Sequence, residues 1–178
     1  MRHQISIGTF LLLIACGGGT ASCREAEAPQ TTDITASRSA FADAESIAEV
    51  GAHDVLVELV PVFATVGITA EPQGEGAFRL SNAAGQTALL AQREEGGRIV
   101  LASGDATFTL VDEQGDWERA TLALLSALDH ALDTLGAHVR AYARYFGGNE
   151  QFVVIMTPAE QAAFDAQQPE SERLHASH

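Results

Sequence analysis

The sequence is poor in cysteine, lysine and aromatic residues. Its two cysteines lie near the N-terminus, at positions 16 and 23, and all ten of its strongly basic residues are arginines. Since the rest of the chain has no cysteine, a disulfide within it is excluded and its stability must come from packing. Aromatic residues make up 6% and hydrophobic residues 46%, so we expect a core of mainly alanine, valine and leucine.

Positive charge is also scarce. The chain has 24 aspartate and glutamate residues against ten arginines, which gives a formal net charge of −14 at pH 7. A body this acidic repels phosphate backbones and anionic lipid headgroups. This excludes nucleic acid as an expected partner, and it excludes membrane binding through a basic patch.

No segment reaches the roughly 20 consecutive apolar residues that a membrane-spanning helix needs. The nearest is Ile5–Ala15, which is shorter, contains three small or polar residues and follows the positive side chain of Arg2. A short apolar stretch after a positive residue is typical of a signal peptide. The sequence therefore predicts that residues 1–15 are a signal peptide and not an uncleaved transmembrane anchor.

The end of this leader, Leu13-Ile14-Ala15-Cys16, resembles the bacterial lipobox, with an aliphatic residue three places before the cysteine and a small residue directly before it. The resemblance implies that the chain is cut before Cys16 and that the cysteine sulfur carries a diacylglycerol. It implies a location in the bacterial cell envelope and attachment to the membrane through that lipid. Gly17 is not the aspartate that retains such proteins on the inner membrane, so the outer membrane is favoured where one is present.

Two alternatives to lipidation at Cys16 remain open at this stage. An ordinary signal peptidase could cut after Ala26-Glu27-Ala28, although Pro29 follows directly and the apolar stretch is distant. Cys23 could carry the lipid instead, but Thr20-Ala21-Ser22 before it lacks the aliphatic residue. Both fit the leader less well than Cys16 does.

The remaining chain divides into three segments by composition. Residues 16–38 hold the lipidated cysteine and a tether rich in small and polar residues, which is expected to be flexible. Residues 39–166 have regular apolar periods and are expected to form a single α+β domain. Residues 167–178 are polar and are expected to be a disordered tail.

The domain is expected to begin with helices. Residues 40–50 have helical spacing, with Ser37 or Ser39 as the N-cap and Gly51 at the end. The stretch 54–66 is ambiguous, because its apolar spacing is helical while its β-branched residues and internal proline also fit a strand. A helix that kinks or breaks near the proline is favoured.

After these helices the apolar period changes to two, which is typical of strands. Glycine, proline and asparagine occur in the short connections between the apolar segments. Connections this short force neighbouring strands to be antiparallel, so the sequence predicts a meander of four to five strands. The expected strands are residues 68–70, 77–80, 86–91, 98–102 and 106–111.

The longest helical pattern covers residues 116–146. Asp116 is the expected N-cap, apolar residues recur every three or four positions as far as Phe146, and Gly147-Gly148 ends the pattern. The sequence predicts one helix of about thirty residues, weakened or bent at Gly136. A coiled coil is one alternative, but packing against the meander is favoured because the sheet's apolar face must be covered.

A strand and a short helix are expected to complete the domain. Residues 151–156 are continuously apolar, as in a buried strand. Thr157, Pro158 and Glu160 then match a capping box with proline in the first turn, which predicts a helix to about Ala166. The order of elements resembles that of small α+β chaperones of secretion systems, a likeness of fold that implies no function.

The chain has no catalytic, metal-binding or nucleotide-binding motif. Its densest polar group is Ser126, Asp129, His130 and Asp133 on the expected long helix. A hydrolytic triad could be drawn from three of these, but the group lies off the leucine stripe and is expected to face solvent. His138 could join nearby carboxylates in a weak metal site, although a plain surface position is favoured. No catalytic residue, metal site or cofactor is therefore assigned.

Four aromatic residues, Trp117, Tyr142, Tyr145 and Phe146, are expected at the two ends of the long helix. Tyr145 falls off the apolar stripe, and an exposed aromatic side chain beside a sheet edge can mark a partner site. A single exposed aromatic is also common on protein surfaces, and that interpretation is favoured here.

These observations favour a non-enzymatic, membrane-anchored module that binds an envelope protein or assists assembly. Its partner would dock on the exposed face or edge of the sheet, or on the long helix. One alternative is an envelope hydrolase whose site is assembled from separate loops. Another is a small-molecule or lipid carrier with a cavity between sheet and helix. The sequence gives no indication of the oligomeric state.

Overall fold

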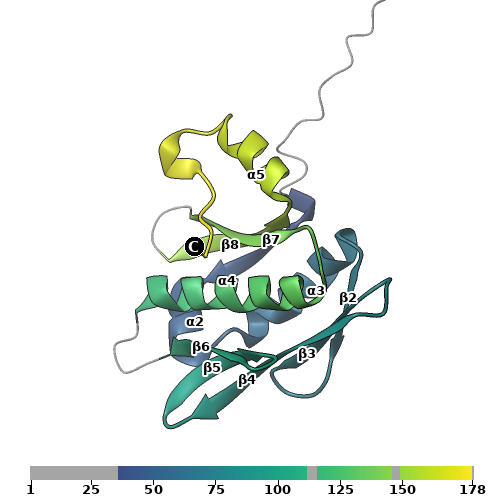
Figure 1. Ribbon diagram of the computed structural model, residues 1–178. Helices are drawn as coiled ribbons and strands as arrows, with labels where there is room; N and C mark the ends of the chain where they lie inside the picture. Colours follow the sequence, from purple (N-terminus) through teal and green to yellow (C-terminus); the bar gives the residue numbers. More distant parts are fainter. Residues whose placement is uncertain (1–35, 112–115, 146–148, 178) are drawn as a thin grey trace, which may run out of the picture.

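The computed structural model describes residues 36–111, 116–145 and 149–177. These residues form two antiparallel sheets with a layer of helices between them, and a short C-terminal helix lies beyond the smaller sheet (Figure 1). The α+β class expected from the sequence is confirmed, and so is the antiparallel meander, which is one of the two sheets.

The larger sheet is this meander of five strands in sequence order, each paired antiparallel with the next. Side chains such as Leu80 and Leu90 point inward and are buried, while Arg79 and Leu89 lie exposed on the outer face. Such alternation is typical of a sheet with one packed and one solvated face. The strands are β2 (Ile68–Pro72), β3 (Ala77–Asn82), β4 (Thr87–Glu95), β5 (Arg98–Ser103) and β6 (Ala106–Val111).

The smaller sheet joins the two ends of the domain. It consists of β1 (Ser39–Asp43), β8 (Glu150–Met156) and β7 (Arg140–Tyr145), in that spatial order and all antiparallel. The buried strand predicted for residues 151–156 is confirmed as β8. It lies in the middle of the sheet, and its residues from Val153 to Met156 are at most 1% exposed.

The start of the domain corrects the helix predicted for residues 40–50. Residues as far as Asp43 form β1, and the helix α2 (Ala44–Val50) begins after them. The N-cap is Asp43 and not a serine, because its Oδ1 accepts hydrogen bonds from the backbone N–H groups of Glu45 (3.0 Å) and Ser46 (3.2 Å). The alternating burial of β1 is a strand pattern that the helical interpretation overlooked. Gly51 ends α2 as predicted.

The ambiguous segment forms a helix, α3 (His53–Thr65), which contains Pro61. Proline cannot donate a hydrogen bond to the carbonyl group of Val57 one turn earlier. Both residues lie on the exposed side of α3, where solvent can satisfy that carbonyl. The opposite side of the helix, with Leu56, Leu59 and Phe63, is buried.

The prediction of one helix over residues 116–146 is wrong. The helix α4 (Trp117–Thr134) begins after the predicted N-cap, Asp116, but its last residue is Thr134, and Leu135 is its C-cap. Gly136 follows with a φ of 61°, and the backbone N–H of Ala137 donates to the carbonyl of Leu132 (2.9 Å). This left-handed glycine cap reverses the chain, which returns as β7. The predicted end at residues 147–148 lies outside the described residues.

The helix α4 lies between the two sheets and supplies the centre of the core. It packs against β4, β5 and β6 on one side and against β7 on the other, with α2 beside it. Leu124, Leu125, Leu128 and Leu132 are fully buried in this position. The coiled-coil alternative does not apply to a helix covered in this way. None of the helices in the described segments is both long and apolar enough to cross a membrane.

The C-terminal part of the chain covers the outer face of the smaller sheet. The predicted capping box is confirmed at the start of α5 (Pro158–Asp165), and the 3-10 helix η1 (Glu170–Glu172) follows. Phe164 of α5 and Leu174 pack on Tyr142 and Val154 in a second apolar cluster. Disorder was expected for residues 167–178, but the structure instead pairs His175 with Ala143 of β7 through two hydrogen bonds of 2.8 Å.

Candidate functional site

The one site residue assigned from the sequence, Cys16, lies outside the described residues, as does the alternative Cys23. Lipidation at Cys16 therefore stays a prediction. The structure describes the domain, and with it most of the side chains that were considered for catalysis, metal binding and partner binding.

The polar group on α4 does not assemble into a triad. His130 places its Nδ1 3.0 Å from the Oγ of Ser103 on β5, while Ser126 donates to the carbonyl of Leu122. Asp133 forms an ion pair of 2.6 Å with Arg140. The four side chains thus have separate partners, and none of these contacts links one member of the group to another.

Asp129 corrects the expectation that this group faces solvent. Its residue is 8% exposed, and its Oδ1 accepts a hydrogen bond of 2.8 Å from the backbone N–H of Ala141 in β7. Its Oδ2 accepts from the Oγ of Ser177 at 2.9 Å. The carboxylate therefore satisfies an outward-pointing donor of the edge strand β7 and holds the C-terminal segment beside it.

The contact between Ser103 and His130 could suggest a nucleophile and its base. Ser103 is 1% exposed, however, so a substrate has no access to its hydroxyl group. The Nδ1 of His130 is occupied by that serine, and no carboxylate among the described residues bonds to the ring. Acyl transfer needs an accessible nucleophile and an orienting acid, and this pair has neither.

No metal centre is found in the part of the chain that the structure describes, where no three histidine, cysteine or carboxylate side chains converge. His138, which was considered as a ligand, is exposed in the connection between α4 and β7.

A groove lies between the start of α4, the end of β7 and the C-terminal segment. We call it the aromatic groove. Its volume is about 610 Å³. Three segments that are far apart in the sequence form its walls, and its lining residues are Trp117, Glu118, Leu122, Tyr145, Leu174, His175 and Ala176.

Three rings make contact in this groove. The centroids of Trp117 and Tyr145 are 6.1 Å apart at 71°, and those of Tyr145 and His175 are 5.0 Å apart at 70°. Both are edge-to-face pairs, which aromatic side chains prefer. Trp117 is still 38% exposed, so the ring cluster is open to solvent. Of the other aromatic residues considered, Tyr142 points to the second apolar cluster, and Phe146 lies outside the described residues.

Tyr145 and Glu118 are close enough to influence one another. Burial raises the pKa of the Tyr145 hydroxyl group, and the negative charge of Glu118 raises it further, while a hydrogen bond with Thr121 acts in the opposite direction. Glu118 is exposed and forms no ion pair with a described basic side chain. The groove thus combines an exposed tryptophan and a partly buried tyrosine with one carboxylate that forms no ion pair with a basic side chain of the described residues.

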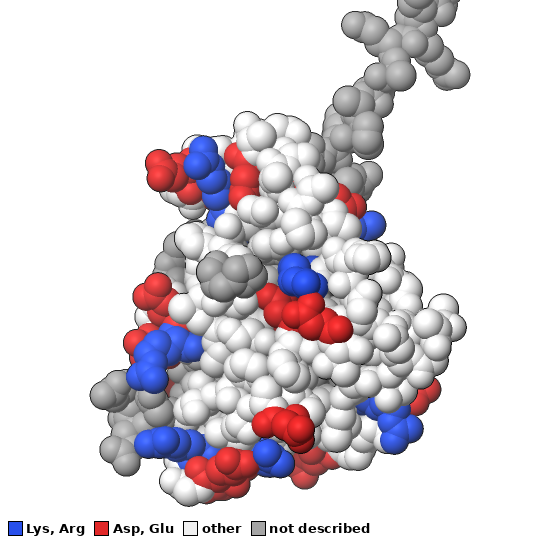
Figure 2. Space-filling model, viewed as in Figure 1, with Lys and Arg blue, Asp and Glu red and all other residues white. Residues whose placement is uncertain are grey.

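Two other surfaces are less suited to binding. A second hollow of about 420 Å³ lies between β1, α2 and α3, and its carboxylates include that of Asp43, which caps α2. The outer face of the meander carries Leu89 as its exposed large apolar residue, beside an ion pair of 2.7 Å between Arg93 and Glu95. Figure 2 shows the face along α4, which is largely uncharged but carries one group of acidic and basic side chains near its middle and others at its margins.

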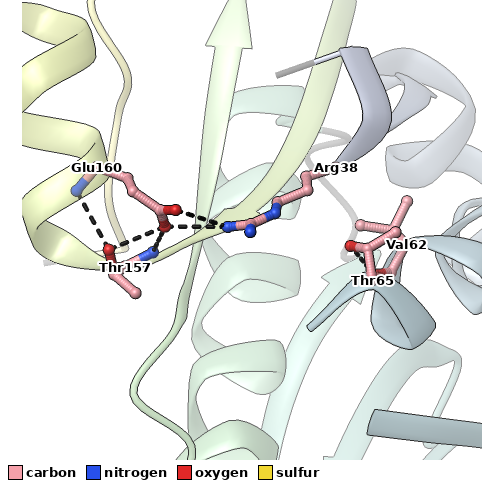
Figure 3. A network of polar contacts seen from close by, with 5 residues as sticks. All are labelled: Arg38, Val62, Thr65, Thr157 and Glu160. Carbon is pink, nitrogen blue, oxygen red and sulfur yellow. Dashed lines mark hydrogen bonds and ion pairs between the residues drawn. The ribbon is translucent and has the colours of Figure 1, made fainter. Parts of the chain in front are cut away.

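A polar network beside the first described residues is shown in Figure 3. Arg38, directly before β1, donates to both carboxylate oxygens of Glu160 on α5, at 2.9 and 3.0 Å. Glu160 also accepts from the backbone N–H of Thr157 (2.8 Å) and from its hydroxyl group (2.9 Å). In Figure 3 this network lies near the end of α3, where Thr65 donates to the carbonyl of Val62. The network holds α5 against the residue directly before β1.

Replacing Glu160 with glutamine should make this network insensitive to acid. Burial opposes ionisation of Glu160, but hydrogen bonds from Thr157 and the charge of Arg38 outweigh it, so the pKa lies below its usual value. A lowered folded-state pKa gives stability that is present above the unfolded-state pKa of about 4.3 and is lost as pH falls through the folded value. We expect the urea midpoints of wild type and Glu160→Gln to differ most at pH 6, with the difference shrinking as pH falls below about 4.3 and vanishing below the folded-state pKa. A difference that stays constant with pH would contradict the role of the charge.

No family model, no curated protein and no solved structure matches this chain.

Proposed function

We propose that this chain is a lipid-anchored protein of the bacterial envelope whose domain binds a protein partner without catalysing a reaction. The lipobox resemblance at Cys16 supports the anchor. The composition of residues 16–38 supports a tether that gives the domain freedom to reach its partner. The aromatic groove is the observation that carries the binding role.

The groove has the properties of a surface that recognises another protein. Tryptophan and tyrosine are the residue types that most often dominate binding energy in protein interfaces. Here Trp117 and Tyr145 lie together at the mouth of a groove of about 610 Å³, and the first of them is 38% exposed. The edge-to-face contacts with Tyr145 and His175 hold the rings in place. Such rings lose little conformational freedom when a partner binds.

The two alternative functions have less support. A hydrolase would need converging catalytic groups, but the histidine and carboxylate side chains of α4 have separate structural partners. A carrier would need an enclosed apolar cavity, but leucines of α4 fill the space between the sheets. A partner docked along α4 itself is also less supported, because both sheets cover this helix.

Site-specific cross-linking in cells tests this function. A photo-reactive amino acid is placed at Trp117, and in a matched control at Val57, which is 46% exposed on α3 and remote from the groove in sequence. We expect light to produce a discrete protein adduct from position 117 and not from position 57. No adduct at position 117, or the same adduct from both positions, would refute binding at the groove.

A further inference from the structure

The charge at the aromatic groove selects the chemistry of its ligand. This inference rests on the proposed function, because it concerns the side chain that the partner places in the groove. Glu118 contributes a carboxylate to the lining, and no arginine is among the lining residues. Glu118 is exposed in the free domain, but a partner docked in the groove would remove water from its carboxylate. A desolvated carboxylate without a cation is costly, so a positively charged group from the partner would be favoured there.

The N-terminus of a helix usually attracts anions, but at α4 a carboxylate of the chain itself already occupies this position. The carboxylate of Asp116 caps α4 and accepts hydrogen bonds from the backbone N–H groups of Glu118 (3.0 Å) and Arg119 (3.2 Å). A full negative charge thus faces the partial positive charge of about half a unit at the helix end. Glu118 adds a second negative charge and Arg119 a positive one in the same turn, so the side chains leave this end of α4 slightly negative.

The aromatic rings favour the same kind of ligand. The faces of tryptophan and tyrosine rings carry negative potential and attract cations, and tryptophan does so most strongly. Trp117 and Tyr145 stand nearly perpendicular to each other, at 71°, and the carboxylate of Glu118 acts on the Tyr145 hydroxyl group. Rings at this angle and a carboxylate can surround a cation from different sides.

None of the arginines that the structure describes is among the residues that line the groove. Arg144 lies on β7 near the groove, but its guanidinium group lies 5.1 Å from the centre of the Phe164 ring and forms an ion pair of 3.3 Å with Glu172. Arg119 follows Glu118 directly on α4 but is not part of the lining. The lining thus offers no arginine to pair with Glu118, and a partner can supply one.

We propose that the aromatic groove binds an arginine side chain of the protein partner, with its guanidinium group against Trp117 and Tyr145 and in an ion pair with Glu118. Arginine fits better than lysine because its planar group stacks on aromatic rings and can form two parallel hydrogen bonds with one carboxylate. Its aliphatic stem contacts Leu122 and Leu174. The strongly acidic chain, with a net charge of −14, adds long-range attraction for a basic partner.

Trp117 is the single tryptophan of the chain, so its fluorescence reports directly on the groove. The full chain in a neutral detergent is titrated with a blocked Gly-Arg-Gly peptide and, separately, with a peptide of the same shape that has neutral citrulline in place of arginine. We expect a saturable fluorescence change with the arginine peptide and binding about tenfold weaker with the citrulline peptide. Binding of the arginine peptide should weaken further as salt is raised.

Two variants make the test specific. Glu118→Gln should weaken the arginine peptide about tenfold and leave the citrulline peptide unchanged, while Glu58→Gln in the second hollow should change neither. Equal binding of the two peptides, or no effect of Glu118→Gln, would overturn the proposal. If cross-linking at position 117 still captures a partner in that case, the proposed function stands and only the arginine assignment fails. A missing adduct at position 117 refutes the function itself.

Discussion

Replacing Asp129 with alanine should lower the free energy of unfolding by about 3 kcal/mol. The carboxylate accepts hydrogen bonds from the backbone of Ala141 and from Ser177, and the residue is 8% exposed. Alanine leaves the N–H group of Ala141, a fully buried residue, without this acceptor. Removing one partner of a buried, charge-assisted hydrogen bond costs more than the bond itself contributes, since the other partner stays desolvated.

Two matched variants separate this effect from a general loss of polar groups on α4. Asp129→Asn keeps an oxygen for the N–H of Ala141 and should cost less than Asp129→Ala. Asp133→Ala removes a neighbouring carboxylate whose side chain is 61% exposed, so its ion pair with Arg140 should matter little. Urea unfolding followed by circular dichroism measures all three. If Asp129→Ala and Asp133→Ala lower the free energy of unfolding equally, the buried hydrogen bonds of Asp129 contribute no more to stability than an exposed ion pair.

Replacing Cys16 with serine should release the protein from membranes and abolish incorporation of labelled fatty acid. Serine has no thiol group to which a diacylglycerol could be attached. Each buried methylene group contributes about 0.8 kcal/mol, so losing two or more acyl chains removes essentially all of the anchoring energy. The acidic chain cannot replace it, since a net charge of −14 is repelled by anionic lipids.

The control for this change is Cys23→Ser, which should keep both the label and the membrane attachment. Fractionation of cells and fatty-acid labelling measure the two effects together. If the label persists in Cys16→Ser and disappears only in Cys23→Ser, the lipid is on Cys23. If neither change alters the label or the attachment, the lipobox interpretation fails.

Local patterns in the sequence predicted a large part of the fold. The period of two and the short glycine-containing connections predicted the meander, because both are properties of neighbouring residues. The capping box at Thr157 was predicted in the same way, since it needs only residues three positions apart. The helix favoured for residues 54–66 from their apolar spacing is confirmed, but it does not break near Pro61, since α3 runs from His53 to Thr65 with the proline inside it.

The error over residues 116–146 has a specific physical cause. Beyond Gly136, Val139 and Tyr142 continue the helical spacing of three, but they belong to the stretch that leads into β7 and to β7 itself. A helical period and a strand period can agree over a few residues, and only the left-handed glycine distinguishes them. Gly136 was noted as a weak point of the helix, when it is the residue that ends it.

The same error hid the candidate site. A continuous helix would put Trp117 and Tyr145 at opposite ends, whereas the reversal at Gly136 brings their ring centroids to 6.1 Å. His175 was treated as part of a polar tail, and nothing local to its sequence indicates that it pairs with β7. Contacts between remote segments of one chain leave no periodic signal, so a single sequence could not predict the groove.

The pairing of β1 with β8 sets an order in which the domain can fold. The meander needs only contacts between strands that are adjacent in the chain, so it can form early, while β1 must wait for the last strand of the domain to be synthesised. Leu174, His175 and Ala176 arrive later still and complete one wall of the aromatic groove. An incomplete chain would therefore lack a finished binding surface, and engagement of a partner would follow completion of the fold.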